Sequence, residues 1–313
     1  MSTDVLIAVV AILGCILFAS ARAQQNPGDV FQDCDTCPEM IVLPTGEAML
    51  GSEPWVQGRL PFEGPVRTAT IEHVLAMSQH ETTRAQFKEF IDATGYVPVD
   101  NSQCFSWNFT SYLGYVSWHT WENPGFYQQE THPVVCVSWR DATAFAAWLT
   151  EKTGRTYRLP SSTEFEYASR AGTRGPWFWG TASASACTYA NVADFTFRKV
   201  YLFDAPFDCD DGFPNTAPVG NYKPNPWGLY DILGNVWEWT DDCSREDVDN
   251  PPLNGAPWLD GKDADCTQRV VRSGSWVTGT GAVRAPAQYF LGDSYHSQIL
   301  GFRLVSVMVI GDD

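Results

Sequence analysis

Cysteines constrain the fold of this chain more than any other residue type, because each disulfide fixes the distance between two segments. Eight of the nine cysteines follow residue 23, and an even number in an exported chain indicates a disulfide framework. Cys34 and Cys37 form a CxxC pair with no second CxxC and no nearby histidine pair, which favours a local disulfide over a zinc site. The other six allow fifteen pairings, of which pairing in sequence order is the simplest: Cys104, Cys136, Cys187, Cys209, Cys243 and Cys266.

An apolar run at residues 5–19, followed by Ala21-Arg22-Ala23, predicts a secretory signal peptide over residues 1–23. Residues 1–4 include no Lys or Arg, which is atypical of such leaders. Two alternatives stay open. One is an uncleaved membrane anchor, since the run approaches the roughly 20 residues that span a bilayer; the other is a lipobox ending at Cys15, which the apolar residues beyond it disfavour. We expect an exported protein, periplasmic or extracellular, with no further membrane segment.

The acidic composition limits the classes of partner. A net charge of -17 would repel nucleic acids and anionic membranes, whereas cationic partners or divalent ions fit better.

No linker, low-complexity tract or fixed-period repeat follows the leader, which indicates one large domain. No P-loop, GxGxxG or GxSxG motif occurs, and the five histidines lack the HxH or HxxxH spacing of metal sites. Nothing in the sequence indicates the oligomeric state.

Hydrophobic patterns and turn residues predict an α+β fold with short antiparallel strands and abundant loops. The predicted elements are strands at residues 40–43 and 48–52 and helices from Thr83 to Gly95, from about residue 139 to Gly154, and from Ser161 onward. Residues 97–131 lack clean periodicity, and the chain after Gly172 is expected to form turns and short strands. At the third helix, a capping box of Ser161 and Glu164 is preferred to a catalytic pair of Glu164 and Glu166.

The segment from Asp231 to Glu238 carries the clearest chemical signal. Two carboxylates flank Gly234, which permits a turn whose carbonyl oxygens point inward. Hard oxygen ligands from one short loop are what calcium prefers. On spacing alone, a buried turn with two solvated acids is an equally good interpretation.

Several motifs follow one another along the chain: Arg158-Leu159-Pro160-Ser161, Tyr189-Ala190-Asn191-Val192, Asp211-Gly212-Phe213, residues 228–239, Arg272-Ser273-Gly274-Ser275-Trp276 and Gly301-Phe302-Arg303. In this order they resemble the sulfatase-modifying-factor, or formylglycine-generating enzyme, family. The resemblance covers residues 39–307 and implies a single domain with a C-type-lectin-like core, about three helices and bound calcium. Residues 24–38 would form a CxxC segment before this domain, and residues 308–313 a tail.

Carried over to this sequence, the resemblance implies two calcium sites, each built from two side chains and two backbone carbonyls. The first would use the side chains of Asn191 and Asp211 with the carbonyls of Val192 and Phe213. The second would use the side chains of Asp231 and Glu238 with the carbonyls of Gly234 and Val236. The oxidase has Asn where this chain has Asp231, so the added charge should strengthen calcium binding.

The catalytic positions of the family are where the match fails. Two cysteines bind Cu(I) in the oxidase, because soft thiolates suit that ion. Their positions here hold Thr278 and Val283, and no cysteine follows Cys266, so copper is not expected. Ser275 matches a serine implicated in that active site, although a structural turn would also retain it.

An exported bacterial branch of the family also lacks the copper cysteines, and one member works in the oxidation of a siderophore chromophore. Similarity to this branch implies the pairs Cys104–Cys136, Cys187–Cys209 and Cys243–Cys266, besides Cys34–Cys37.

Three functions follow from these observations. The first is a non-copper oxidative modification enzyme acting on a peptide or peptide-derived substrate, with Ser275 in its site. The second is a non-catalytic binding module for a peptide, glycan or partner protein, which presents aromatic side chains unless these form the core: Trp237, Trp276, Tyr289 and Tyr295. The third, formylglycine generation on sulfatases, is disfavoured because the copper cysteines are absent.

Overall fold

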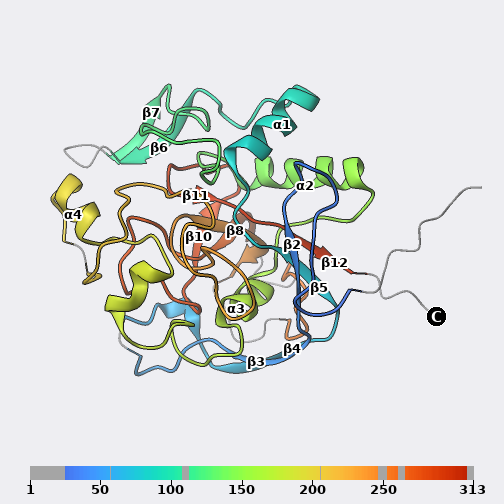
Figure 1. Ribbon diagram of the computed structural model, residues 1–313, viewed down its shortest axis with the longest axis vertical. Coiled ribbons are helices and arrows are strands. Elements are labelled where there is room, and N and C mark those ends of the chain that lie inside the picture. Colours follow the sequence, from blue (N-terminus) through green and yellow to red (C-terminus); the bar gives the residue numbers. More distant parts are fainter. Residues whose placement is uncertain are drawn as a thin grey trace, which may run out of the picture.

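Short strands and helices are joined by long loops in this computed structural model (Figure 1), which describes residues 25–56, 58–107, 113–204, 206–245, 252–259 and 265–308. The predicted signal peptide and residues 309–313 of the predicted tail lie outside these ranges. The strands are β1 (Val30–Phe31), β2 (Met40–Leu43), β3 (Gly46–Leu50), β4 (Arg67–Ile71), β5 (Leu75–Ser78), β6 (Gln103–Trp107), β7 (Leu113–Ser117), β8 (Trp237–Ser244), β9 (Asp265–Arg272), β10 (Tyr289–Gly292), β11 (Leu300–Gly301) and β12 (Val305–Val307).

Two four-stranded sheets organise the described residues. The first has the order β1–β2–β5–β12 and is antiparallel throughout. The second has the order β10–β9–β8–β11, in which the pair β8–β11 is parallel and the others are antiparallel. Strands β3 and β4 form one separate hairpin and β6 and β7 another. The first sheet joins segments from both ends of the described chain, and residues 24–38 contribute β1 to it.

The helices begin and end where local signals indicate. The helices are α1 (Arg84–Thr94), α2 (Trp139–Thr153), α3 (Ser162–Arg170) and α4 (Phe195–Tyr201), with short 3-10 turns at Pro61–Glu63 and Ser183–Thr188. Thr83 caps α1, and Gly95 ends it in the left-handed region at φ 67°. Ser161 and Glu164 form the predicted capping box of α3. Helix α4 was not predicted, because its seven residues are rich in aromatic and β-branched types with low helix propensity.

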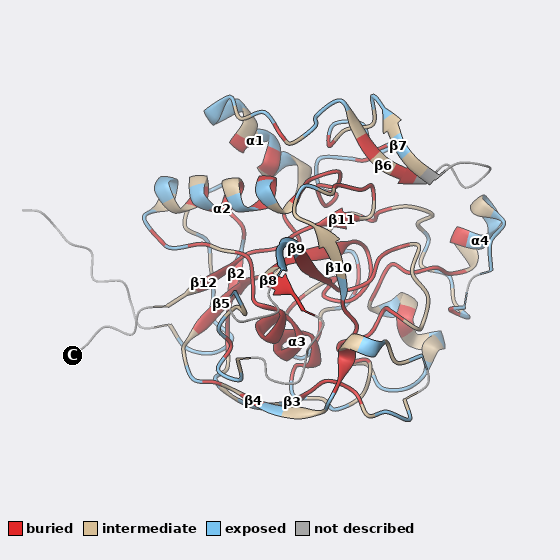
Figure 2. Ribbon diagram, turned by 180° about the vertical axis from the view of Figure 1, so that it is seen from behind, coloured by how far each residue is buried: buried red, intermediate tan, exposed pale blue. Residues whose placement is uncertain are grey.

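Helix α3 is buried along its whole length (Figure 2). Both oxygens of Glu164 bind Arg158 at 2.7 Å, and Glu166 binds Arg170 and Arg272. Burial raises the pKa of Glu164, but hydrogen bonds from Arg158 and His73 outweigh it and hold that pKa below its usual range. The two glutamates therefore stabilise α3, as the capping interpretation predicted.

Within residues 97–131, where the sequence shows no clean periodicity, β6 and β7 form a hairpin that was not predicted. Long-range contacts hold it: the Phe105 amide donates to the His296 carbonyl at 3.0 Å, and Cys104 is bonded to Cys136. Such contacts leave no periodic signal in the local sequence.

Four disulfides link the described residues, and their pairs are those that the resemblance implied: Cys34–Cys37, Cys104–Cys136, Cys187–Cys209 and Cys243–Cys266. No helix in the described ranges combines the length and apolar character needed to cross a bilayer. The α+β architecture is as predicted.

Candidate metal sites and ligand pocket

The turn from Asp231 to Glu238 is bent by left-handed residues. Asp231, Gly234 and Asn235 have φ values of 52°, 92° and 53°. Asn and Asp tolerate this region better than other side chains do. Gly234 is required for a second reason: a Cβ there would lie 2.5 Å from the Asn191 carbonyl oxygen. The Asn235 amide also donates to that oxygen at 2.8 Å, so the turn packs against the segment that carries the first predicted calcium site.

The first predicted site, named here the Asn191 site, comprises Asn191, Val192, Asp211 and Phe213. Asp211 joins its two segments, because its carboxylate accepts from the Val192 amide at 2.8 Å and the Phe213 amide at 2.9 Å. Asn191 is fully buried, and its Oδ1 has no hydrogen-bond partner. No backbone amide of the described residues donates to the carbonyl oxygens of Val192 and Phe213. Asn191 Oδ1 is therefore free to bind a cation, and the two carbonyl oxygens are not occupied by the backbone.

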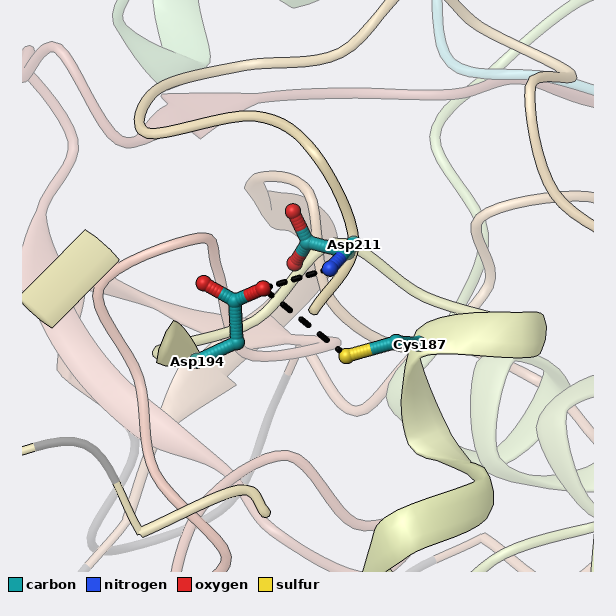
Figure 3. A group of neighbouring side chains, drawn as sticks. All are labelled: Cys187, Asp194 and Asp211. Carbon is teal, nitrogen blue, oxygen red and sulfur yellow. Dashed lines mark hydrogen bonds between the residues drawn. The ribbon is translucent and has the colours of Figure 1, made fainter. Parts of the chain in front are cut away.

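A second acid, Asp194, lies beside Asp211 and Cys187 (Figure 3). The Cys187 sulfur is bonded to Cys209, so it offers no thiolate. The Asp194 carboxylate accepts from the Phe197 amide at the start of α4 and from the Asp211 amide, at 2.8 and 2.5 Å. The first of these contacts makes Asp194 the N-cap of α4. Burial raises the pKa of Asp211 to about 8, and the charge of Asp194 adds to the rise.

The second predicted site, named the Asp231 site, comprises Asp231, Gly234, Val236 and Glu238. Asp231 is buried; its Oδ2 accepts from the Gly220 amide at 2.7 Å, and its Oδ1 has no partner. Both oxygens of Glu238 are bound by the fully buried Arg303, at 2.7 and 2.9 Å. The Gly234 carbonyl accepts from the Ser273 hydroxyl at 3.0 Å. Of the two acids, only Asp231 has a free oxygen.

Sequence reasoning missed Glu81, a third buried acid at the Asp231 site. Its Oε1 accepts from Asn235 Nδ2 at 3.0 Å, and its Oε2 has no partner. Burial raises the pKa of Glu81 well above its usual range, and the charges of Asp231 and Glu238 raise it further. Glu81 precedes the cap of α1 and is far from the turn in sequence, so a search within motifs could not find it.

The three positions that the resemblance assigns to the family's catalytic groups differ in burial. Ser275 is fully buried, and its hydroxyl and amide both contact Thr278 Oγ1, at 2.8 and 3.0 Å. Val283 is also fully buried and packs in the core. Thr278 alone of the three lines a surface pocket.

This Thr278 pocket has a volume of about 370 Å³. Apolar and aromatic side chains dominate its lining, and Thr278 and Ser297 supply aliphatic hydroxyl groups. Its wall comprises Trp237, Val271, Val277, Thr278, Gly279, Ala282, Tyr289, Leu291, Tyr295, Ser297, Ile299 and Leu300. No thiol, imidazole, carboxylate or amine is among these described residues.

Three of the four aromatic residues proposed for binding line the Thr278 pocket. Trp237 and Tyr289 pack edge to face, with ring centroids 5.2 Å apart, and Tyr289 is 41% exposed. Tyr295 packs against Tyr115 of the β6–β7 hairpin at 6.3 Å. Trp276 is fully buried in a cluster with Phe197, so it belongs to the core.

Residues 26–308 match the sulfatase-modifying factor enzyme 1-like domain. The chain belongs to this family. The match includes the Cys34–Cys37 segment.

Two relatives and one solved structure place the chain within the sulfatase-modifying factor enzyme 1-like family. An "Inactive C-alpha-formylglycine-generating enzyme 2" of Bos taurus is 30% identical over 263 residues, which are 74% of this chain and 80% of the relative. A "Formylglycine-generating enzyme" of Mycobacterium tuberculosis is 32% identical over 240 residues, 64% of this chain and 73% of the relative. PvdO from Pseudomonas aeruginosa superposes with a TM-score of 0.76 at 30% identity, and the match covers 91% of this chain and 100% of PvdO.

Similar identity to an active and an inactive relative means that identity alone does not assign an activity to this family member. An activity has to be argued from the side chains that line the Thr278 pocket.

Proposed function

We propose that this family member is an exported, calcium-binding protein whose Thr278 pocket binds an apolar or aromatic group of a peptide or peptide-derived ligand. The lining of the pocket carries this proposal. Aromatic and aliphatic walls with two aliphatic hydroxyls are typical of sites that bind and orient a ligand. Export is supported by the four disulfides, which form and persist in oxidising compartments.

The same lining argues against the parent oxidation. Copper(I) needs soft thiolate or thioether ligands, and the pocket has hydroxyl groups instead. Ser275 is buried and contacts Thr278, so its hydroxyl does not face the pocket. Among the described residues, the lining of this pocket therefore has no donor suited to that metal.

Calcium is proposed for the Asn191 and Asp231 sites because their donors are hard oxygens, several of them buried without a hydrogen-bond partner. A buried polar atom without a partner costs about 1–3 kcal/mol, and a coordinated ion would remove that cost. The Asn191 site joins two separate segments, one around Asn191 and one around Asp211, so its ion would bind the folded chain preferentially.

Binding is tested with acetylated pentapeptides that differ at one position, which is Trp, Phe or Ser, by calorimetry in calcium buffer. We expect saturable binding of the aromatic peptides and weaker binding of the Ser peptide. Tyr289→Ala should weaken binding at least tenfold, because Tyr289 forms a wall of the pocket. Tyr127→Ala is the matched control, since Tyr127 is 79% exposed and outside the lining. Equal affinity for the three peptides would contradict the proposal.

Oxidative modification of a peptide-derived substrate is the competing function. Oxygen uptake and peptide mass are measured in the same mixtures. Unchanged peptide mass is the expected result, and a mass change that depends on the protein would replace binding with catalysis as the function.

A further inference from the structure

The Asp231 site has an unbalanced charge. Three carboxylates, Glu81, Asp231 and Glu238, are each at most 1% exposed, and one cation, Arg303, is 0% exposed. The ionised group therefore carries two negative charges away from water. An isolated buried charge is costly, so such charges are paired, protonated or bound to a metal ion.

Arg303 cannot balance all three acids, because its donors are already used. Its Nε and Nη2 bind the two oxygens of Glu238, and Nη2 also donates to the Tyr230 carbonyl at 3.0 Å. Nη1 donates to the carbonyls of Ser78 and Gln79 at 3.4 Å. Glu81 Oε2 and Asp231 Oδ1 are left without a donor.

Asn235 fixes the orientation of Glu81. Its Nδ2 donates to Glu81 Oε1 at 3.0 Å, and its Oδ1 accepts from Asn191 Nδ2 at 3.1 Å and from the Ala217 amide at 2.9 Å. Asn235 is fully buried, and these contacts define which end of its amide is the donor. Partners of this kind hold metal ligands in place in other proteins. One oxygen of Glu81 is thus anchored, and the other is left for a ligand.

We infer that Glu81 is a calcium ligand of the Asp231 site and that its Oε2 acts together with Asp231 Oδ1. This inference rests on the calcium part of the proposed function and adds a residue from outside the turn. A divalent ion would neutralise the two excess charges and supply the missing partner of both oxygens. It would also tie the segment before α1 to the turn before β8, which are distant in sequence.

The test compares the wild type with Glu81→Gln by thermal unfolding in chelator and in calcium, and by calorimetric titration with calcium chloride. Glu81→Gln keeps the shape of the side chain and removes one crowded charge, so the chelated variant should melt no lower than the chelated wild type. Its calcium-induced rise in melting temperature should fall by more than half, with at least tenfold weaker binding at one of two sites.

Two further variants separate coordination from charge and from general stability. Glu81→Asp keeps the charge but withdraws the oxygen by one methylene, so its calcium affinity should also fall. Asp242→Asn removes another buried carboxylate, one that accepts from the Ser162 and Trp258 amides away from the site, and should leave the calcium-induced rise unchanged.

The outcomes distinguish this inference from the proposal on which it rests. If the melting temperature of the wild type does not change with calcium, both the calcium proposal and the role of Glu81 would be overturned. A wild type that responds, with an equal response in Glu81→Gln or an unaltered affinity in Glu81→Asp, would overturn the role of Glu81 alone.

Discussion

The Asp231 site and the Thr278 pocket lie on the same sheet-centred scaffold but depend on their side chains in different ways. At the Asp231 site, three buried acids lie near one cation, Arg303, which binds only Glu238 among them, so the loss of Arg303 would leave the charge of Glu238 unpaired in the interior. At the pocket, Thr278 lies in the lining beside apolar and aromatic side chains, and no charged group is among the described residues there. We therefore expect a substitution in the pocket to cost less stability than one among the buried charges.

The largest expected effect comes from breaking the buried ion pair. Arg303→Met leaves Glu238 without its partner beside two other acids, so the free energy of unfolding should fall by about 3–5 kcal/mol. Urea unfolding in chelator measures this change. The control is Lys199→Met, because both side chains of the Lys199–Asp210 pair are exposed, at 69% and 47%, and such pairs contribute about 0–1 kcal/mol. Equal losses of unfolding free energy in the two variants would show that the buried Arg303–Glu238 pair contributes no more to stability than an exposed pair.

Removal of calcium should have the next largest effect. An ion present at 100 times its dissociation constant stabilises the folded state by about 2.7 kcal/mol per site. Melting in chelator, in calcium and in magnesium measures the difference, and magnesium should substitute poorly because it demands a smaller octahedral site. A melting temperature that is the same in all three buffers contradicts calcium at both sites.

The chelated protein should lose stability as the pH rises. The pKa of Asp211 in the folded state, about 8, lies above its unfolded value near 4, so the folded state binds the proton more tightly. The resulting stability is complete below about pH 4 and is lost as the pH approaches 8, by at most about 2 kcal/mol between pH 6 and 7.5. Calcium should reverse this loss, because it binds the ionised carboxylate. Urea titrations at three pH values, with and without calcium, check the sign.

The smallest effect is expected at the floor of the pocket. Thr278→Val removes the hydroxyl that contacts Ser275, so the free energy of unfolding should fall by only about 1 kcal/mol. The calcium-induced rise in melting temperature should be unchanged. A loss as large as that of Arg303→Met would mean that the pocket is as tightly constrained as the Asp231 site.

Local signals made the helices predictable, and distance in sequence limited the prediction of the sites. The capping pairs of α1 and α3 lie within three residues of each other, so the sequence displays them directly. Glu81 and Arg303 reach the turn at Asp231 only through the folded core. Arg303 and Glu238 each lie in a motif, but their pairing was not predicted, because a contact between residues 65 positions apart leaves no local pattern.

The pocket was predictable only in outline for a related reason. Aromatic residues occur throughout this chain, and composition does not separate a groove from a core. Trp237 lines the pocket, whereas Trp276 is enclosed by Phe197 and Phe126. Trp237 and Trp276 both lie in motifs of the family resemblance. Whether each tryptophan lines the pocket or lies in the core therefore depends on how β8, β10 and α4 pack around it.

Mass spectrometry of a Cys-x-Pro-x-Arg peptide, incubated with oxygen and the copper-loaded protein, tests the central claim most directly. The account predicts an unchanged cysteine, because Thr278 and Val283 cannot provide thiolate ligands for Cu(I). Conversion of that cysteine to an aldehyde would contradict it, since the oxidation would then proceed without the thiols on which the family's reaction depends.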